Sequence, residues 1–483
     1  MGTPDYIDRM NVPIGSSIRH ALRVIDETGH GCVLLLDPET GHFAGLITDG
    51  DIRRALLAGG SLDSPVAGVP RPTPTTGRVG MPPEQIAELM GERIRVLPLL
   101  DDQNRVTELV LLDRRVRLSV AAPSLGEREL EYVTECLLTG WISSAGKFVT
   151  QFEDCFATFC GTRYGVATSS GTSALHLSLL ALDIGPGDEV IVPSLTFIAT
   201  ANAVAYTGAH PVAVDSESRT WNMDPQCIED AVTARTRAII VVHLYGHPTD
   251  MDPVLDIARR HGFPVVEDAA EAHGATYKGR TVGSIGDIGA FSFYGNKIVT
   301  TGEGGMVATD RSDLAERVRL LRAHGMAPGR RYWHPVVGFN YRLTNLQAAV
   351  GVAQMERVDA ILAAKRGIAA AYDEGLHDLP GLTLPPREAW AEPVFWLYSI
   401  LVDPDEFGCA REDLMARLDS RGVETRPLFP PIHTQPIYRT ERALPVAERI
   451  ARVGLSLPSA VGLGKSDITR VVETIRDVRH ARC

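Results

Sequence analysis

Seven short apolar runs, spaced along residues 165–309, are the feature that most constrains how this chain can fold. Stretches with helical periodicity separate the runs, and this alternation predicts a largely parallel sheet with helices on both faces. Side chains that bind ligands in such sheets gather just beyond the carboxyl ends of the strands. The predicted strands cover residues 165–168, 189–192, 210–214, 238–243, 264–267, 288–293 and 306–309.

The composition limits the possible classes of function. The 483 residues carry a formal net charge of −12, which argues against binding to nucleic acid or to an anionic membrane surface. The seven cysteines are scattered without Cys-x-x-Cys spacing, so we expect reduced thiols and no metal site. The N-terminus has no signal-peptide pattern, and no apolar run is long enough to cross a bilayer. We therefore expect a cytoplasmic protein of two or three domains.

Residues 1–115 contain a partial internal repeat. The first copy has helical periodicity followed by two short apolar runs, and a similar order returns after a connector rich in proline and glycine. Such duplication predicts a tandem pair of modules packed face to face. The elements expected in the second copy are a helix over residues 83–90 and strands over residues 95–100 and 106–112.

One lysine, Lys297, stands between a predicted strand and a glycine-rich turn, within the segment FSFYGNKIVTTGEGG (residues 291–305). A long amine held between aromatic residues and glycines can be partly desolvated, which lowers its pKa and makes the neutral, nucleophilic form available. Such an amine can form a Schiff base with a carbonyl cofactor, for which pyridoxal phosphate (PLP) is the obvious candidate. The alternative is an ordinary surface lysine in a hairpin.

Small polar residues suited to an anion follow two of the predicted strands. Ser170, Gly171 and Thr172 lie between a strand and a helix, where backbone N–H groups and hydroxyls bind anions. Serine and threonine are also ordinary helix caps. Ser292, five residues before Lys297, can donate a hydrogen bond to a phosphate.

Two larger side chains follow other strands. Asp268 comes where a predicted parallel strand ends, and a carboxylate there can keep a pyridine nitrogen protonated. A helix-capping aspartate is the alternative. Phe197 also follows a strand and can either stack on a planar ring or pack in the core.

These motifs together resemble the DegT family of sugar-nucleotide aminotransferases, which are fold-type I PLP enzymes. The resemblance covers roughly residues 118–480 and rests on SSGTSALH, PSLTFIATANAV, VEDAAEAHGA, FSFYGNKIVTTGEGG and GFNYRLTNLQAAVG. It implies an α/β fold with a large, mostly parallel seven-stranded sheet and a small C-terminal α+β domain. It also implies PLP as the cofactor and a homodimer with active sites at the subunit interface.

The resemblance also implies roles for individual residues. Lys297 would bind the cofactor covalently and act as the base, and Asp268 would hold the pyridine nitrogen. Glu271 would lie near the cofactor's 3-hydroxyl, and Asn340 would reach the phosphate bound by the neighbouring subunit. The remaining positions would be the phosphate ligands Ser170, Gly171, Thr172 and Ser292 and the stacking aromatic Phe197.

Within this family the chain is most similar to perosamine synthases, which aminate carbon 4 of GDP-4-keto-6-deoxymannose. Glutamate is the expected amino donor. Arg330 and Arg331 would pair with the diphosphate of the nucleotide sugar, or would be solvated charges. Arg426 and His433 would face the substrate. The alternatives are a UDP- or dTDP-linked 3- or 4-keto sugar as substrate or, in another class, a nucleotide-sensing regulatory protein on a PLP fold.

The segment GLITDGDIRR (residues 45–54) resembles CBS domains, so residues 1–115 are similar to a CBS pair with a regulatory or structural role. The resemblance implies that Thr48 contacts the phosphate of an adenine nucleotide and that Asp51 accepts hydrogen bonds from its ribose. The second copy has Leu112 and Arg115 at these positions, so at most one site is expected. In the alternative, a structural or dimerising module, Asp51 serves only as a charge at a helix start.

We therefore expect three domains: residues 1–115, the CBS-like pair; residues 116–365, the large PLP-binding domain; and residues 366–483, the small C-terminal domain. One long helix over residues 346–378 is expected to lead from the second into the third.

Overall fold

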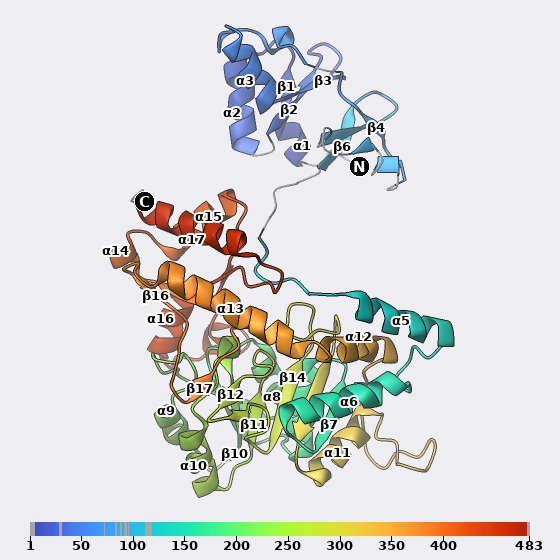
Figure 1. Ribbon diagram of the computed structural model, residues 1–483, viewed down its shortest axis with the longest axis vertical. Coiled ribbons are helices and arrows are strands. Elements are labelled where there is room, and N and C mark those ends of the chain that lie inside the picture. Colours follow the sequence, from blue (N-terminus) through green and yellow to red (C-terminus); the bar gives the residue numbers. More distant parts are fainter. Residues whose placement is uncertain are drawn as a thin grey trace. The chain divides into compact units, whose positions relative to one another are not determined.

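The structure, a computed structural model, describes residues 5–28, 31–71, 73–82, 85–86, 89–90, 94, 96–111 and 118–480. The chain divides into two compact units, Met1–Val116 and Arg117–Cys483. Figure 1 traces both along the sequence. Among the described residues, no helix combines the length and apolar composition needed to cross a membrane.

The N-terminal unit contains two three-stranded sheets with the same build. In the first, β1 (Asn11–Pro13) is parallel to β2 (Cys32–Leu36), which is antiparallel to β3 (Phe43–Thr48). The second repeats this order and these directions with β4 (Gly77–Arg78), β5 (Val96–Leu100) and β6 (Val106–Leu111). This repeated topology agrees with the duplication predicted from the sequence. The helices of the first half are α1 (Asp5–Arg9), α2 (Ile18–Thr28) and α3 (Asp49–Leu57).

Some predictions for the second half fall outside the described residues. Leu112 and Arg115, the positions equivalent to the possible ligand residues of the first half, are among them, as is part of the helix expected over residues 83–90.

The larger unit is built on one seven-stranded sheet. Strand β15 runs antiparallel to both of its neighbours, and the other adjacent pairs are parallel. All seven strands predicted from the apolar runs are present, so the prediction of a largely parallel sheet is confirmed. In spatial order they are β7 (Tyr164–Thr168), β15 (Gly305–Thr309), β14 (Ile288–Ser292), β11 (Val265–Asp268), β10 (Thr236–Val242), β8 (Glu189–Pro193) and β9 (His210–Val214).

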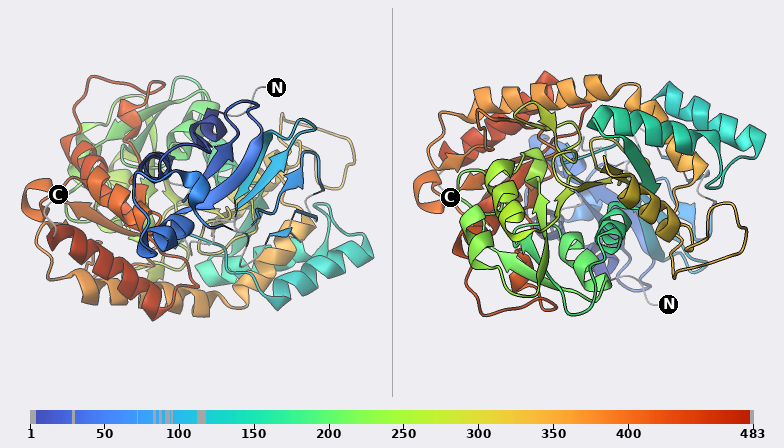
Figure 2. Two further views of the ribbon diagram at one scale, coloured as in Figure 1. Left: turned by 90° about the horizontal axis from the view of Figure 1, so that it is seen from above. Right: turned by 90° about the horizontal axis from the view of Figure 1, so that it is seen from below.

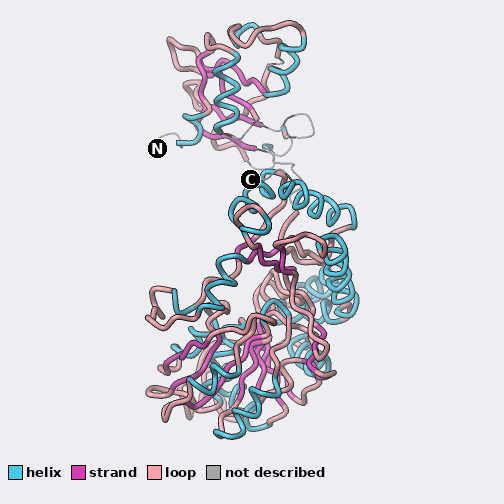
Figure 3. The backbone as a smooth tube through the Cα atoms, turned by 90° about the vertical axis from the view of Figure 1, so that its left-hand side faces the viewer, coloured by secondary structure: helices cyan, strands magenta, loops and turns pink. Residues whose placement is uncertain are grey.

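Helices cover both faces of this sheet (Figures 2 and 3), because its strands are apolar on both sides. In β8, Val190 and Val192 belong to one hydrophobic core and Ile191 to the other. The core containing Val190 includes residues of α7 (Gly171–Ala181), α8 (Ala199–Tyr206) and α11 (Ser312–Arg322). The core containing Ile191 includes residues of α5 (Glu127–Thr139), α6 (Lys147–Cys160), α9 (Pro225–Asp230), α10 (Met251–His261) and α12 (Asn345–Met355).

The C-terminal part has an antiparallel four-stranded sheet in the order β16 (Leu382–Thr383), β18 (Tyr398–Val402), β20 (Gly454–Leu457) and β19 (Arg426–Pro427). A third hydrophobic core joins it to α13 (Val358–Leu376), α15 (Arg411–Ser420) and α17 (Lys465–His480). Other short elements are β12 (Thr276–Tyr277), β13 (Arg280–Thr281), β17 (Ala391–Glu392), α14 (Pro404–Phe407) and α16 (Pro445–Val453).

The prediction of one long helix over residues 346–378 was wrong. The segment forms two helices, α12 and α13, which meet at Glu356 and Arg357. Arg357 has φ −124° and ψ 15°, outside the helical range, and its guanidinium donates to Ser124 Oγ at 2.7 Å. Helix α13 runs across residues 365 and 366, and the domain boundary expected there stays a prediction.

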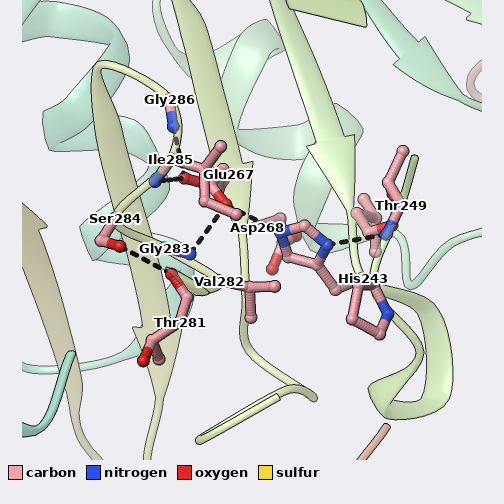
Figure 4. A network of polar contacts seen from close by, with 12 residues as sticks. His243, Thr249, Glu267, Asp268, Thr281, Val282, Gly283, Ser284, Ile285 and Gly286 are labelled. Atoms are coloured by element: carbon pink, nitrogen blue, oxygen red, sulfur yellow. Dashed lines mark hydrogen bonds and ion pairs between the residues drawn. The ribbon is translucent and has the colours of Figure 1, made fainter. Parts of the chain in front are cut away.

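A buried network of polar contacts around Glu267 supports the end of β11 (Figure 4). The Glu267 carboxylate accepts hydrogen bonds from the backbone N–H groups of Gly283, Ile285 and Gly286 at 2.6–2.7 Å. His243 Nε2 lies 3.0 Å from Glu267 Oε2, and both side chains are fully buried. Because the Thr249 N–H donates to His243 Nδ1, the ring proton is on Nε2 and points to Glu267.

This network keeps Glu267 ionised. Burial acts to raise the pKa of Glu267, but the hydrogen bond from His243 and the backbone N–H groups outweigh it, so the pKa lies below its ordinary value. Successive side chains of a strand point to opposite faces of the sheet. Glu267 therefore fixes the end of β11 from one face of the sheet, and its neighbour Asp268 points to the opposite face.

We expect Glu267→Gln to lower the free energy of unfolding by about 3 kcal/mol or more, because the amide replaces a buried, fully bonded carboxylate. Urea denaturation at pH 7 measures the loss. Glu229→Gln is a matched control, since Glu229 also lies 3.0 Å from a histidine, His261, but at the surface. Equal losses from the two substitutions would contradict the importance of the buried network.

Candidate active site

A pocket of about 360 Å³ lies at the carboxyl ends of the parallel strands of the large sheet. Asp268 ends β11, Ser292 ends β14, and Ser170 precedes the first residue of α7. The residues predicted from the sequence that line this pocket are Ser170, Gly171, Thr172, Phe197, Asp268, Glu271, Ser292, Lys297 and Arg426.

The Lys297 amine lies inside the pocket. Its Nζ is 3.5 Å from Glu271 Oε1 and 3.7 Å from the centroid of the Trp396 ring. Burial lowers the pKa of Lys297, while the charges of Glu271 and Asp268 oppose that shift. The structure therefore does not match the alternative of an ordinary surface lysine.

Two buried carboxylates share the pocket with this amine. Asp268 accepts hydrogen bonds from Thr200 Oγ1 at 2.8 Å and from the Ala270 N–H at 3.2 Å, and burial raises its pKa. Glu271 accepts from the Tyr245 N–H at 2.9 Å, and burial raises its pKa to about 6. Both carboxylates are thus held in place by fixed donors and lie within reach of a group bound in the pocket.

The first turn of α7 and the end of β14 form a cradle suited to an anion. The first N–H groups of a helix have no partner within the helix and can bind a phosphate. Ser170 caps α7 by accepting from the Ser173 N–H at 3.1 Å. Gly171 allows a close approach, because a Cβ atom there would lie 2.6 Å from Ser292 Cβ.

Four aromatic side chains from distant segments form a wall of the pocket. Phe197, which is 55% exposed, contacts Phe429 with ring centroids 5.6 Å apart. Tyr245 stacks on Phe429 at 5.2 Å and lies parallel to Trp396 at 6.1 Å. Tyr245 adopts a left-handed backbone (φ 51°), a strained conformation for a bulky residue that is typical of functional sites.

Sequence reasoning did not assign Trp396, Tyr245, Phe429 or Asn296 to this pocket. Asn296 Oδ1 is buried and has no hydrogen-bond partner in the structure. An orphaned acceptor beside Lys297 is suited to a ligand that donates a hydrogen bond. Asn296 could have been found from its position directly before Lys297. The three aromatic residues are 50 residues or more away from that lysine in the sequence.

Four predicted site residues are not among the described residues that line the pocket. Asn340 is exposed, and its side-chain oxygen accepts from Arg342 at 2.9 Å. Arg330 and Arg331 lie on an exposed segment, each over a neighbouring aromatic ring.

His433, the fourth of these residues, is buried between Ser194 and Glu448. Its Nδ1 lies 2.6 Å from Ser194 Oγ, and its Nε2 lies 3.2 Å from Glu448 Oε1. Both ring nitrogens of His433 thus face protein side chains, and its contact with the substrate stays a prediction.

In the N-terminal unit, Thr48 and Asp51 form a helix cap. The Asp51 carboxylate accepts from the Thr48 hydroxyl at 2.7 Å and from Arg54 at 2.6 Å. Burial acts to raise the pKa of Asp51, but the hydrogen bonds from Thr48 and Arg54 outweigh it and lower the pKa. Asp51 therefore has the role at a helix start that was named as the alternative. A cavity of about 510 Å³ adjoins Asp51 and Arg54.

Comparison with known proteins identifies two families. Residues 123–476 match the DegT/DnrJ/EryC1/StrS aminotransferase family, and residues 6–58 match the CBS domain. GDP-perosamine synthase of Caulobacter vibrioides is 51% identical over 365 residues, covering 75% of this chain and 98% of that protein.

Solved structures of two similar proteins have the same fold. The crystal structure of DesV from S. venezuelae is 41% identical with a TM-score of 0.69, covering 73% of this chain and 94% of the other. The PLP form of Spr1654 from Streptococcus pneumoniae is 26% identical with a TM-score of 0.71, covering 76% and 100%. The chain belongs to the DegT/DnrJ/EryC1/StrS family of sugar aminotransferases and carries a CBS domain near its N-terminus.

Proposed function

We propose that this protein uses PLP to transfer the amino group of glutamate to carbon 4 of GDP-4-keto-6-deoxy-D-mannose, the reaction of a GDP-perosamine synthase. The observation that carries this proposal is the enclosed Lys297 amine, beside two buried carboxylates, in a chain of the aminotransferase family. The identity of 51% to a GDP-perosamine synthase supports the choice of sugar nucleotide.

The residues of the pocket fit PLP. Ser170, Gly171, Thr172 and Ser292 would hold its phosphate, since the cradle at Gly171 leaves no room for a Cβ atom and presents N–H groups and hydroxyls. Asp268 would keep the pyridine nitrogen protonated, Phe197 would stack on the ring, and Glu271 would lie near the 3-hydroxyl. When bound, PLP supplies an aldehyde that exchanges amino groups and a ring that accepts the electron pair released at the donor's α-carbon.

Lys297 would have two tasks: its Nζ would hold the cofactor covalently, and as a free amine it would take the proton from the α-carbon of glutamate. A lowered pKa favours both tasks, because each needs the neutral amine. Trp396, Phe429 and Tyr245 would exclude water from this side of the pocket.

The alternatives differ in substrate or in class. A UDP- or dTDP-linked 3- or 4-keto sugar would use the same amine and carboxylates, and the exposed Arg330 and Arg331 would suit the diphosphate of any of these nucleotides. A nucleotide-sensing protein that has lost turnover would not need Lys297 and Asp268 together in one pocket.

We expect the purified protein, supplied with PLP and glutamate, to aminate GDP-4-keto-6-deoxymannose faster than the UDP- and dTDP-linked keto sugars, as measured by product mass. Lys297→Ala should reduce the rate by about 10³-fold or more. Lys278→Ala is the matched control, since Lys278 is exposed and pairs with Asp252. A preference for another nucleotide would move the proposal to that substrate, and an active Lys297→Ala variant would contradict the assigned role.

A homodimer with shared active sites is part of the proposal. Asn340 lies outside the pocket of its own chain and is exposed, as expected for a residue that reaches the phosphate bound by a partner. Large apolar side chains suited to burial against a second copy are also exposed on and beside α5: Leu130, Leu137, Leu138 and Trp141.

Mixing two variants, each of which we expect to be impaired alone, tests this arrangement. A mixed dimer of Lys297→Ala and Asn340→Ala chains has one site with both residues intact, so we expect refolding the two together to restore part of the wild-type rate. A mixture no more active than the two separate variants would show that Asn340 does not act across an interface.

We also propose that the N-terminal CBS domain, residues 6–58, binds an adenine nucleotide beside Asp51. The cavity next to Asp51 and Arg54 supports this site, and the exposed Arg54 guanidinium is suited to a phosphate. Asp51 would accept ribose hydroxyls only with the lone pairs that Thr48 and Arg54 leave free. The nucleotide would therefore compete with the helix cap for this carboxylate.

A further inference from the structure

The indole ring of Trp396 lies against the Lys297 amine. The amine lies 3.7 Å from the centre of the indole ring, at the distance of a cation–π contact. The two residues come from different parts of the fold, since Lys297 follows β14 and Trp396 precedes β18. The other charged or titratable groups that act on this amine are Glu271, Asp268 and His273.

Trp396 is held through two contacts of its indole ring and one of its backbone carbonyl. Its Nε1–H donates to the backbone carbonyl of Asn296, the residue before Lys297, at 2.7 Å. The carbonyl of Trp396 accepts from the Lys365 amine at 2.6 Å, and Lys365 also donates to the Ser459 carbonyl at 2.5 Å. The ring lies parallel to Tyr245, with 10° between the planes.

The backbone around Trp396 is also tightly fitted to the large sheet domain. Gly246 has φ 91°, and a Cβ atom there would lie 3.0 Å from the backbone nitrogens of Phe395 and Trp396. The Val394 N–H donates to the Gly246 carbonyl at 3.0 Å, and Phe395 has a left-handed backbone with φ 50°. These contacts fix the backbone from which the indole extends toward the amine.

We propose that Trp396 is a positioning residue, which holds the free amine of Lys297 against its indole face and fixes where that amine stands when it takes a proton. This inference rests on the proposed function, because it concerns the stage of that reaction at which the Lys297 amine is free. Lys365 and Asn296 act through Trp396, by holding its two ends.

The titration of Lys297 in the cofactor-free protein tests this role. Competitive acetylation across a range of pH, followed by mass spectrometry, gives the midpoint at which Lys297 becomes reactive, with the exposed Lys278 as the internal reference. Because the indole face stabilises the ammonium, Trp396→Leu should lower the midpoint by about 0.5–1.5 pH units. Trp396→Phe retains an aromatic face and should lower it less.

An unchanged or raised Lys297 midpoint in Trp396→Leu would overturn the proposal. If the leucine variant does not fold, Trp396→Phe decides the question by the same criterion, since its ring is the weaker cation partner and lacks the N–H. The readout needs no cofactor and no turnover. A failure here therefore refutes only the role of Trp396, whereas the cofactor role of Lys297 stands or falls on covalent labelling of the loaded protein.

Discussion

The burial of one amine and two carboxylates in a single pocket is the constraint on which the site depends. An isolated buried charge is costly, and burial acts to neutralise each of these groups. It lowers the pKa of Lys297 and raises those of Asp268 and Glu271, while the opposite charges partly offset the shifts. A group that brings a protonated ring nitrogen and an anionic phosphate would complete this set of charges. The proposed cofactor is such a group.

The fold keeps these groups in position by fixing the strand ends. Glu267, fully bonded behind β11, holds the end of the strand that carries Asp268. The left-handed turn at Tyr245 presents the N–H that binds Glu271, and the same segment packs against the backbone of Trp396. Glu267 does not line the pocket, yet it fixes the strand end that carries Asp268, and the backbone at Tyr245 fixes Glu271.

Local patterns in the sequence were sufficient to predict the sheet and to select residues that the structure brings together in one pocket. The strands are short apolar runs bounded by turns, and Asp268 and Ser292 fall at the ends of two of them, so topology alone brings them near Lys297. Trp396 and Phe429 could not be predicted in this way, because they come from a separate part of the fold about 100 residues or more away. At the break between α12 and α13, Arg357 hydrogen-bonds to Ser124, a contact between residues far apart in sequence that local patterns do not reveal. His433 was expected from the resemblance to face the substrate, and in the structure its ring contacts Ser194 and Glu448.

The most direct test of the central claim is to reduce the PLP-loaded protein with borohydride and to map the labelled peptide. Reduction makes the covalent bond between cofactor and lysine permanent, so the label identifies the residue without any assumption about substrate. The account predicts a single label on Lys297. A label on another lysine, or no label after loading, would contradict it.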